Sequence, residues 1–236
     1  MSRVLISGDG RMGTALVRLL ETQDPAAADL LLAEGLTSAD VVIDYSHPDW
    51  TGPLLQRLLE TPRALVVGTT GLDAASEARL EALSERAPVL VAPNTGTGIN
   101  VLRDLVRSAA RALPGWDLEV LEMHHRKKVD APSGTAWLLL EAAAEGSEPG
   151  TGRERAVPSR VGETGARSDR EIGVQTLRGG DVVGEHTVYL VGHGERIELT
   201  HRAWDRDTFA RGGLRAAGWL VGQPPGRYTM RDVLGL

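Results

Sequence analysis

Short aliphatic runs alternate with helical patterns through the first 94 residues of the chain. Aliphatic and β-branched residues cluster in five runs that predict strands: Val4–Ser7, Asp29–Ala33, Val41–Tyr45, Ala64–Gly68 and Val89–Ala92. Between two of these runs, Leu54, Leu55, Leu58 and Leu59 recur at helical spacing. Strands that alternate with helices form parallel βαβ units, so this part of the chain predicts an α/β fold with a doubly wound parallel sheet.

The pattern changes after Asn94, where a helical run from Ile99 to Leu113 follows. Three later runs alternate apolar and polar residues, as half-buried strands do: Trp116–Glu122, Asp181–Val191 and Arg196–His201. The last two are joined by a short glycine-containing turn, which predicts an antiparallel hairpin. We therefore expect a second, α+β domain with a mixed or antiparallel sheet. A final amphipathic helix, about Arg206–Val221, would return to the first domain, giving domains of residues 1–94 plus 206–236 and 95–205.

Residues 146–170 are rich in Gly, Pro, Ser, Arg and Glu and contain few large apolar side chains. This composition predicts a mobile loop. Long loops in compact domains are either functional or disordered, so a lid and a disordered linker are both open interpretations.

The composition excludes several classes of chemistry. With 42% hydrophobic and 25% charged residues, the 236-residue chain can bury a sizeable core. It contains no cysteine, which excludes disulfides, thiolate nucleophiles and iron–sulfur clusters, so redox chemistry needs a borrowed cofactor. The formal charge of -6 disfavours a general nucleic-acid binder. We see no presequence and no apolar run of about 18 to 20 residues, and expect a cytoplasmic protein without membrane contact.

A glycine-rich turn follows the first predicted strand directly, and a helical pattern begins after it. Its residues are Gly8, Asp9, Gly10, Arg11, Met12 and Gly13. In a G-x-G-x-x-G turn, the first glycine permits a tight turn, the second lets the backbone approach a pyrophosphate, and the third lets helix and strand pack closely. The free N–H groups and dipole of the helix then favour phosphate. The turn therefore predicts a dinucleotide-binding (Rossmann) domain, with a purely structural glycine turn as the alternative.

An acidic residue lies where such a domain needs one to bind the ribose hydroxyls. Glu34 follows the second predicted strand, although it could also be a solvated loop residue. A carboxylate at this position repels a 2′-phosphate and favours NADH, whereas Arg11 could pair with that phosphate. NADH and NADPH both remain open.

The most informative stretch runs from Glu122 to Ala136 and reads EMHHRKKVDAPSGTA. It joins the end of a strand, a basic loop and the start of a helix. The unpaired N–H groups and capping side chains at such a helix start are well placed to receive a carboxylate. The segment therefore predicts a pocket for an anionic small molecule, with a histidine as acid or base and a lysine able to donate a proton.

Three other interpretations of this segment compete. Adjacent histidines on a strand point to opposite faces, so His124 and His125 could not easily share a metal ion, and we expect no metal site. The basic run lacks interleaved aromatic residues and belongs to an acidic chain, which disfavours nucleic acid. Ser133 lacks the G-x-S-x-G context of a nucleophilic serine.

The segment from Glu122 to Ala136 resembles the signature of the 4-hydroxy-tetrahydrodipicolinate reductase family, E-x-H-H-x-x-K-x-D-A-P-S-G-T-A. Shorter stretches are also similar to that family: Gly10–Gly13, Gly68–Gly71, Ala92–Asn94, Gly180–Thr187 and Met230–Leu234. The resemblance covers nearly the whole chain. It implies a reductase that transfers hydride from NAD(P)H to 4-hydroxy-tetrahydrodipicolinate with loss of water, giving tetrahydrodipicolinate in diaminopimelate and lysine biosynthesis.

The resemblance also implies roles for individual residues and for the two domains. His124 is the expected acid/base residue and Lys128 the expected proton donor. The expected substrate ligands are His125, Ser133, Gly134 and Thr135. The expected cofactor contacts are Gly8 to Gly13, Glu34, Gly68, Thr69, Thr70, Ala92, Pro93, Asn94 and Thr95. The first domain would bind the dinucleotide, with its nicotinamide facing the helix start at Ser133, and the second would bind substrate and build a homotetramer through its sheet.

Two other functions share some of these features. Another reductase of the same fold, such as an aspartate dehydrogenase, would have the glycine turn but would not need the segment from His124 to Ala136. A non-catalytic NAD-binding sensor is the alternative outside the enzymes, because a fold does not fix a function.

Overall fold

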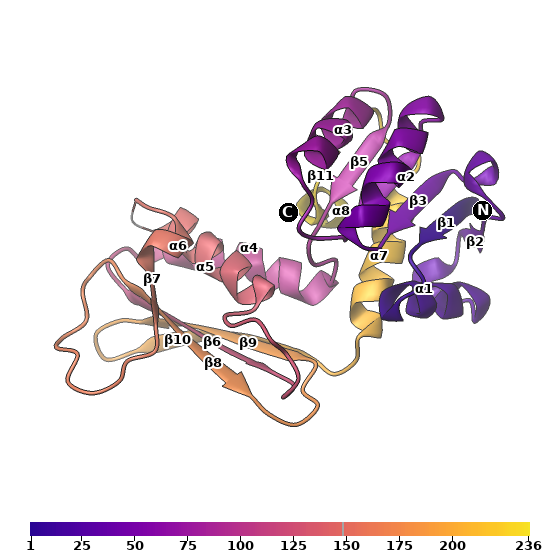
Figure 1. Ribbon diagram of the computed structural model, residues 1–236. Helices are drawn as coiled ribbons and strands as arrows, with labels where there is room; N and C mark the ends of the chain where they lie inside the picture. Colours follow the sequence, from indigo (N-terminus) through magenta and orange to yellow (C-terminus); the bar gives the residue numbers. More distant parts are fainter. Residues whose placement is uncertain (148) are drawn as a thin grey trace. The chain divides into compact units, whose positions relative to one another are not determined.

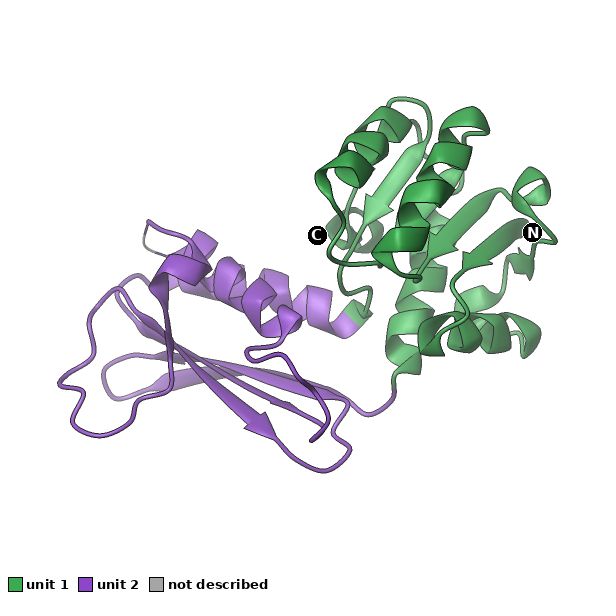
Figure 2. Cartoon of the chain, in the orientation of Figure 1, with its two compact units in different colours: residues 1–97, 206–236 green, residues 98–205 purple. Residues whose placement is uncertain are grey.

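The computed structural model describes residues 1–147 and 149–236 (Figure 1). The chain divides into two compact units, residues 1–97 with 206–236 and residues 98–205 (Figure 2). The first change of unit falls at 97/98, against a predicted boundary at 94/95, and the second at 205/206. Within the described residues, no helix combines the length and apolarity that a membrane span needs.

The first unit is built on a six-stranded sheet in the order β11-β5-β4-β3-β1-β2, with every neighbouring pair parallel. Its strands are β1 (Ser2–Ser7), β2 (Leu30–Leu32), β3 (Val41–Asp44), β4 (Ala64–Val67), β5 (Pro88–Val91) and β11 (Gly226–Tyr228). Its helices are α1 (Arg11–Glu21), α2 (Pro48–Glu60), α3 (Ala74–Ser84), α7 (Asp207–Leu220) and α8 (Met230–Leu234). The predicted doubly wound parallel sheet is confirmed.

Alternate residues of the central strands supply two separate cores. Val41 and Ile43 of β3 pack into the core that contains residues of α1, α7 and α8, whereas Val42 packs into the core that contains residues of α2 and α3. Every residue of β3 and β4 is buried. A strand covered on both faces needs apolar side chains along its length, which is why β4 and the first three residues of β3 are continuous aliphatic runs; only Asp44, at the end of β3, is polar.

The strand order places a topological switch point between β1 and β3. The connection from β1 leads through α1 to β2 on one side of β1, and the next connection crosses to β3 on the other side. Helix α1 contributes to one core and α2, which follows β3, contributes to the other. The two loops therefore diverge at the carboxyl ends of β1 and β3, where open α/β sheets bind their ligands.

The second unit has a mixed five-stranded sheet in the order β10-β9-β6-β8-β7. Its strands are β6 (Asp117–His124), β7 (Ala156–Pro158), β8 (Ile172–Arg178), β9 (Gly184–Val191) and β10 (Arg196–Ala203). Strands β9 and β10 form the predicted antiparallel hairpin, β6 pairs antiparallel with β9 and parallel with β8, and β7 pairs parallel with β8. Apolar residues of α4 (Thr97–Ala112) and α5 (Gly134–Gly146) form one core with β6, β8 and β9.

The interpretation of residues 146–170 as a loop without regular structure is wrong for part of that range. Helix α6 (Gly152–Arg155) and strand β7 form within it, and Glu148 lies outside the described residues. Thr151 and Glu154 make a capping box that starts α6. The buried Arg155 side chain donates to the Arg170 carbonyl and to the Ser147 hydroxyl, at 2.7 and 2.9 Å. Contacts between residues distant in sequence therefore order a segment whose composition alone predicts a loop.

Candidate active site

The three glycines of the first turn have three different environments. Gly8 has φ of 112°, and a Cβ atom there would lie 2.5 Å from the Tyr45 carbonyl oxygen. A Cβ atom on Gly13 would overlap the Gly8 carbonyl, so this glycine lets α1 pack against the turn. At Gly10 the Cβ position faces open space. The first and third glycines are thus needed by the fold, whereas the second leaves room for a ligand.

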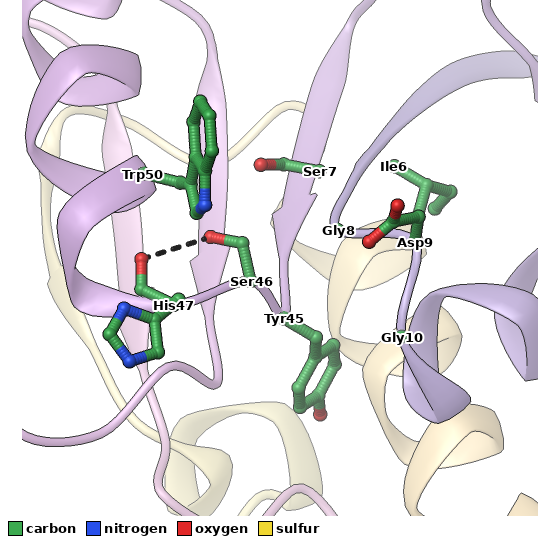
Figure 3. Close-up of a pocket in the computed structure, with 9 residues that line it drawn as sticks. All are labelled: Ile6, Ser7, Gly8, Asp9, Gly10, Tyr45, Ser46, His47 and Trp50. Carbon is green, nitrogen blue, oxygen red and sulfur yellow. Dashed lines mark hydrogen bonds between the residues drawn. The ribbon is translucent and has the colours of Figure 1, made fainter.

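A cavity of about 660 Å³ opens beside this turn, at the carboxyl ends of β1 and β3 (Figure 3). Its lining residues are Ile6, Ser7, Gly8, Asp9, Gly10, Tyr45, Ser46, His47 and Trp50. Helix α1 begins next to Gly10 without a side-chain cap and has no acidic residue in its first turn. Its first N–H groups are therefore suited to an anion, and the volume and the glycine environment fit the pyrophosphate of a dinucleotide.

Other predicted cofactor residues lie outside the set that lines this cavity. Arg11 is exposed at the first position of α1, Met12 packs on the core, and Glu34 is exposed two residues after β2. The remaining ones follow the next two strands along the sheet: Gly68, Thr69 and Thr70 after β4, and Ala92, Pro93, Asn94 and Thr95 after β5. Because β3, β4 and β5 are parallel neighbours, these loops and the cavity share one edge of the sheet.

Buried hydrogen bonds hold the loops at this edge. The carboxylate of Asp44, at the end of β3, accepts from the hydroxyls of Ser46 (2.6 Å), Thr51 (2.6 Å) and Thr69 (3.0 Å). The Tyr45 hydroxyl bonds to that of Thr95, which donates to the Phe209 carbonyl at 2.7 Å. Burial raises the pKa of Tyr45 to about 12, so its phenol stays protonated.

The glycine environments predict opposite effects for two alanine substitutions. Gly10→Ala should keep the melting temperature but weaken NADH binding at least about tenfold, because its methyl group would occupy the space in which we expect the pyrophosphate. Gly13→Ala lowers the melting temperature, since its Cβ meets the Gly8 carbonyl; such overpacking costs about 1–3 kcal/mol. Gly218→Ala, at an open position on α7, is the control and should lower neither the melting temperature nor the NADH affinity. Differential scanning fluorimetry measures the melting temperature and calorimetric titration measures the NADH affinity. A Gly10→Ala protein that binds NADH with wild-type affinity contradicts the placement of the pyrophosphate beside Gly10.

In the second unit, strand alternation brings Glu122 and His124 to the helix-covered face of the sheet. Alternate residues of β6 are buried, from Leu118 and Val120 to Glu122 and His124. Glu122 has no exposed surface. Its carboxylate lies 2.5 Å from His124 Nδ1 and accepts a hydrogen bond from the Ser133 N–H at 3.0 Å. It also accepts hydrogen bonds from both terminal guanidinium nitrogens of Arg178, each at 2.9 Å. One buried acid therefore joins the end of β6, the start of α5 and β8.

The charge state of Glu122 follows from these contacts. Burial alone would raise its pKa, but the hydrogen bonds from His124, Arg178 and the Ser133 N–H outweigh burial and lower the pKa to about 2. As a carboxylate, Glu122 accepts the Nδ1–H of His124, so the Nε2 atom of this ring takes no part in the contact. A Cβ atom on Gly184 would lie 3.0 Å from this Nε2, so a glycine at 184 keeps the space next to it open.

Ser133 is a capping residue in this arrangement. It is 1% exposed, and its hydroxyl accepts the Ala136 N–H at 3.1 Å at the start of α5. The same oxygen lies 3.2 Å from Nε2 of His186, whose ring contacts that of His124 edge to face at 5.1 Å. Burial, together with the charge of His124, lowers the pKa of His186 to about 3, so His186 is neutral at pH 7.

Lys128 lies in the loop between β6 and α5. Its Nζ is 2.8 Å from Asp130 Oδ1, and the Lys128 side chain lowers the pKa of that carboxyl. His125 is half-buried just after β6, while Gly134 and Thr135 are the first two residues of α5. The predicted residues of this segment therefore gather between the end of β6 and the first turn of α5, where cationic side chains and a helix N-terminus suit a carboxylate ligand.

Sequence reasoning missed several residues of both sites. It assigned no role to Glu122, Arg178 or His186, although the two-residue spacing of Glu122 and His124 on a strand already places them on one face. Tyr45, Ser46, His47 and Trp50 were missed as well, and the signal for them was their position after a parallel strand next to β1.

Comparisons with known proteins agree with this arrangement. The profile "Dihydrodipicolinate reductase, N-terminus" matches residues 25–95, and "Dihydrodipicolinate reductase, C-terminus" matches residues 98–234. The 4-hydroxy-tetrahydrodipicolinate reductase of Alkalilimnicola ehrlichii is 48% identical over 98% of this chain and 82% of its own length. That of Anaeromyxobacter dehalogenans is 42% identical over 100% of this chain and 98% of its own length.

A solved structure supports the fold. It is described as a dipicolinate-bound dihydrodipicolinate reductase from Paenisporosarcina sp. TG-14, with a TM-score of 0.76 and 24% identity over 98% of both chains. The identities to the two curated relatives extend over nearly the whole of this sequence, and the two profiles together span most of it. This chain therefore belongs to the dihydrodipicolinate reductase family.

Proposed function

We propose that the protein is an NAD(P)H-dependent oxidoreductase that reduces 4-hydroxy-tetrahydrodipicolinate to tetrahydrodipicolinate, with loss of water, in diaminopimelate and lysine biosynthesis. The observation that carries the proposal is the buried Glu122 carboxylate, which holds the His124 ring and the start of α5 together beside Lys128. The two curated relatives, 48% and 42% identical to this chain, are named for that reaction.

The proposed site residues of the second unit have two roles, binding of the substrate and transfer of a proton. The proposed ligands of the two substrate carboxylates are His125, just after β6, and Ser133, Gly134 and Thr135 at the start of α5. Lys128 or His124 supplies the proton as the 4-hydroxyl departs as water. The bound dinucleotide supplies the hydride. The main contribution of the protein is then orientation and neutralisation of a doubly charged ring.

The proposed cofactor contacts are the glycine turn Gly8 to Gly13, Glu34, Gly68 to Thr70 and Ala92 to Thr95. Glu34 and Arg11 are both exposed, and Glu34 would repel the 2′-phosphate of NADPH whereas Arg11 would attract it. Calorimetric titration of the protein with NADH and with NADPH therefore tests the cofactor preference. We favour NADH, because a carboxylate repels that phosphate.

The proposed assembly is a homotetramer formed through the sheet of the second unit. The face of this sheet opposite the helices bears partly exposed apolar residues: Leu121, Met123, Leu177 and Tyr189. Analytical ultracentrifugation tests it, and replacing Leu121 and Met123 with Glu should shift the protein toward smaller species. The proposed location is the cytoplasm, which cell fractionation tests.

A coupled assay tests the reaction. The protein is mixed with enzymatically generated 4-hydroxy-tetrahydrodipicolinate and either NADH or NADPH, and absorbance of the reduced cofactor is followed. We expect oxidation that depends on this substrate and is inhibited by pyridine-2,6-dicarboxylate. Cofactor binding without substrate-dependent oxidation would indicate a sensor, and oxidation with other imines alone would indicate a different reductase.

A further inference from the structure

An exposed indole forms one wall of the cavity beside the glycine turn. Trp50 is the third residue of α2 and 70% of its surface is exposed, yet it lines the same cavity as Gly8 and Gly10. Figure 3 shows Trp50 on the α2 side of the cavity and Ile6 and Asp9 on the other side. A tryptophan ordinarily buries a large area, so a bare indole on a cavity wall is a surface that a flat ligand can cover.

The backbone that bears Trp50 is held in place. The Asp44 carboxylate accepts from Ser46 Oγ before α2 and from Thr51 Oγ1 directly after Trp50, both at 2.6 Å. Nδ1 of His47 accepts the Asp49 N–H at 3.4 Å, which caps α2. The indole therefore projects from an anchored turn on a regular element, so the backbone that presents it is held without a ligand.

The cavity and the sheet order indicate which half of a dinucleotide lies against the indole. The cavity extends from the glycine turn, where the pyrophosphate is proposed to bind, to Trp50. The loops proposed to hold the nicotinamide half follow β4 and β5, which lie on the far side of β3 from β1. Glu34, the proposed ligand of the adenosine ribose, follows β2, which is the neighbour of β1, so we expect the adenosine half over β1.

We infer that Trp50 is the surface on which the adenine ring of the cofactor stacks. The inference rests on the proposed function, since it requires a dinucleotide at the glycine turn. In this arrangement the adenine ring contacts Trp50 of α2, and Glu34 binds only the hydroxyls of the adenosine ribose. Stacking of a base on an aromatic side chain is sequence-tolerant and needs a π-face rather than hydrogen bonds, which is what an exposed indole offers.

Calorimetric titration of the full-length protein tests the inference with three probes: NADH, ADP-ribose and reduced nicotinamide mononucleotide. Trp50→Ala should weaken NADH and ADP-ribose by the same factor, about tenfold or more, as expected from base–aromatic stacking. Its affinity for reduced nicotinamide mononucleotide should match the wild type. Trp50→Phe, which keeps a π-face, should recover most of the lost affinity.

Trp204→Ala is the matched control, because Trp204 is 82% exposed and belongs to the other unit. It should bind NADH and ADP-ribose as the wild type does. Wild-type affinity of Trp50→Ala for NADH overturns the inference and leaves the proposed function intact. An equal loss for reduced nicotinamide mononucleotide overturns it too, because the indole would then serve the other half. Failure of the wild type to bind NADH, NADPH and ADP-ribose overturns the proposed function itself.

Discussion

We expect Lys128→Ala to lower kcat for the proposed reaction about 10²- to 10⁴-fold, the loss typical of a positioned general acid, and to leave the dissociation constant of NADH almost unchanged. The two effects separate because Lys128 and its partner Asp130 belong to the second unit, whereas the glycine turn belongs to the first. Stopped-flow turnover and calorimetric NADH titration measure them independently.

Lys127→Ala is the matched control for that experiment. Lys127 precedes Lys128 in the same loop and is exposed, so its removal changes the local charge equally. We expect a small change in kcat. If Lys127→Ala and Lys128→Ala reduce turnover equally, the loop acts through its net charge and Lys128 is not the proton donor. If Lys128→Ala reduces turnover and NADH affinity together, its role is structural.

Glu122→Gln should destabilise the fold by about 3–5 kcal/mol, the range for removal of one partner of a buried ion pair. The substitution preserves shape, but it leaves the Arg178 guanidinium without its carboxylate and replaces the anion that accepts from His124 and from the Ser133 N–H. Turnover should fall as well, because the His124 ring loses the acceptor that fixes its orientation. Urea denaturation at fixed protein concentration measures the stability change.

The stability difference between the wild type and Glu122→Gln should decrease as the pH falls. The pKa of Glu122 is about 2 in the folded protein, against 4.5 for an ordinary glutamate. Its ionised form therefore stabilises the fold fully above pH 4.5, and this contribution is lost as the pH falls toward 2. The stability gap between wild type and Glu122→Gln should be constant near neutrality and narrow in acid. Glu119→Gln, on the same strand but partly exposed, should show a much smaller gap. A gap that persists unchanged at pH 3 contradicts an ionised Glu122.

The fold could be predicted from the sequence wherever a local pattern determines the structure. The runs at Val41–Ile43 and Ala64–Val67 are aliphatic at every position because both faces of these strands are covered. Strand β11 and helix α8 were missed, since three to five residues are too few to show a period. Helix α6 and strand β7 were missed for another reason: they depend on contacts of Arg155 with a residue fifteen positions along the chain.

For the candidate site too, the sequence predicts residues that are close along the chain but not those that the sheet brings together. His124, Lys128 and Ser133 lie in one continuous segment, so their proximity follows from the sequence. Arg178 and His186 reach Glu122 and Ser133 only because β8 and β9 flank β6. No periodicity reveals which strands become neighbours. Trp50 was missed because an exposed aromatic residue at the start of a helix has no meaning until the cavity beside it is known.

The discontinuity of the first unit has a consequence for biosynthesis of the chain. Strands β1 to β5 are translated early, but Leu214, Ala217 and Leu220 of α7 belong to the same core as Val41 and Ile43. Residues 98–205 are complete on the ribosome before these core residues exist. The sheet that contains the glycine turn therefore emerges first and is finished last, and a chain truncated before residue 206 exposes an apolar face that chaperones and proteases recognise.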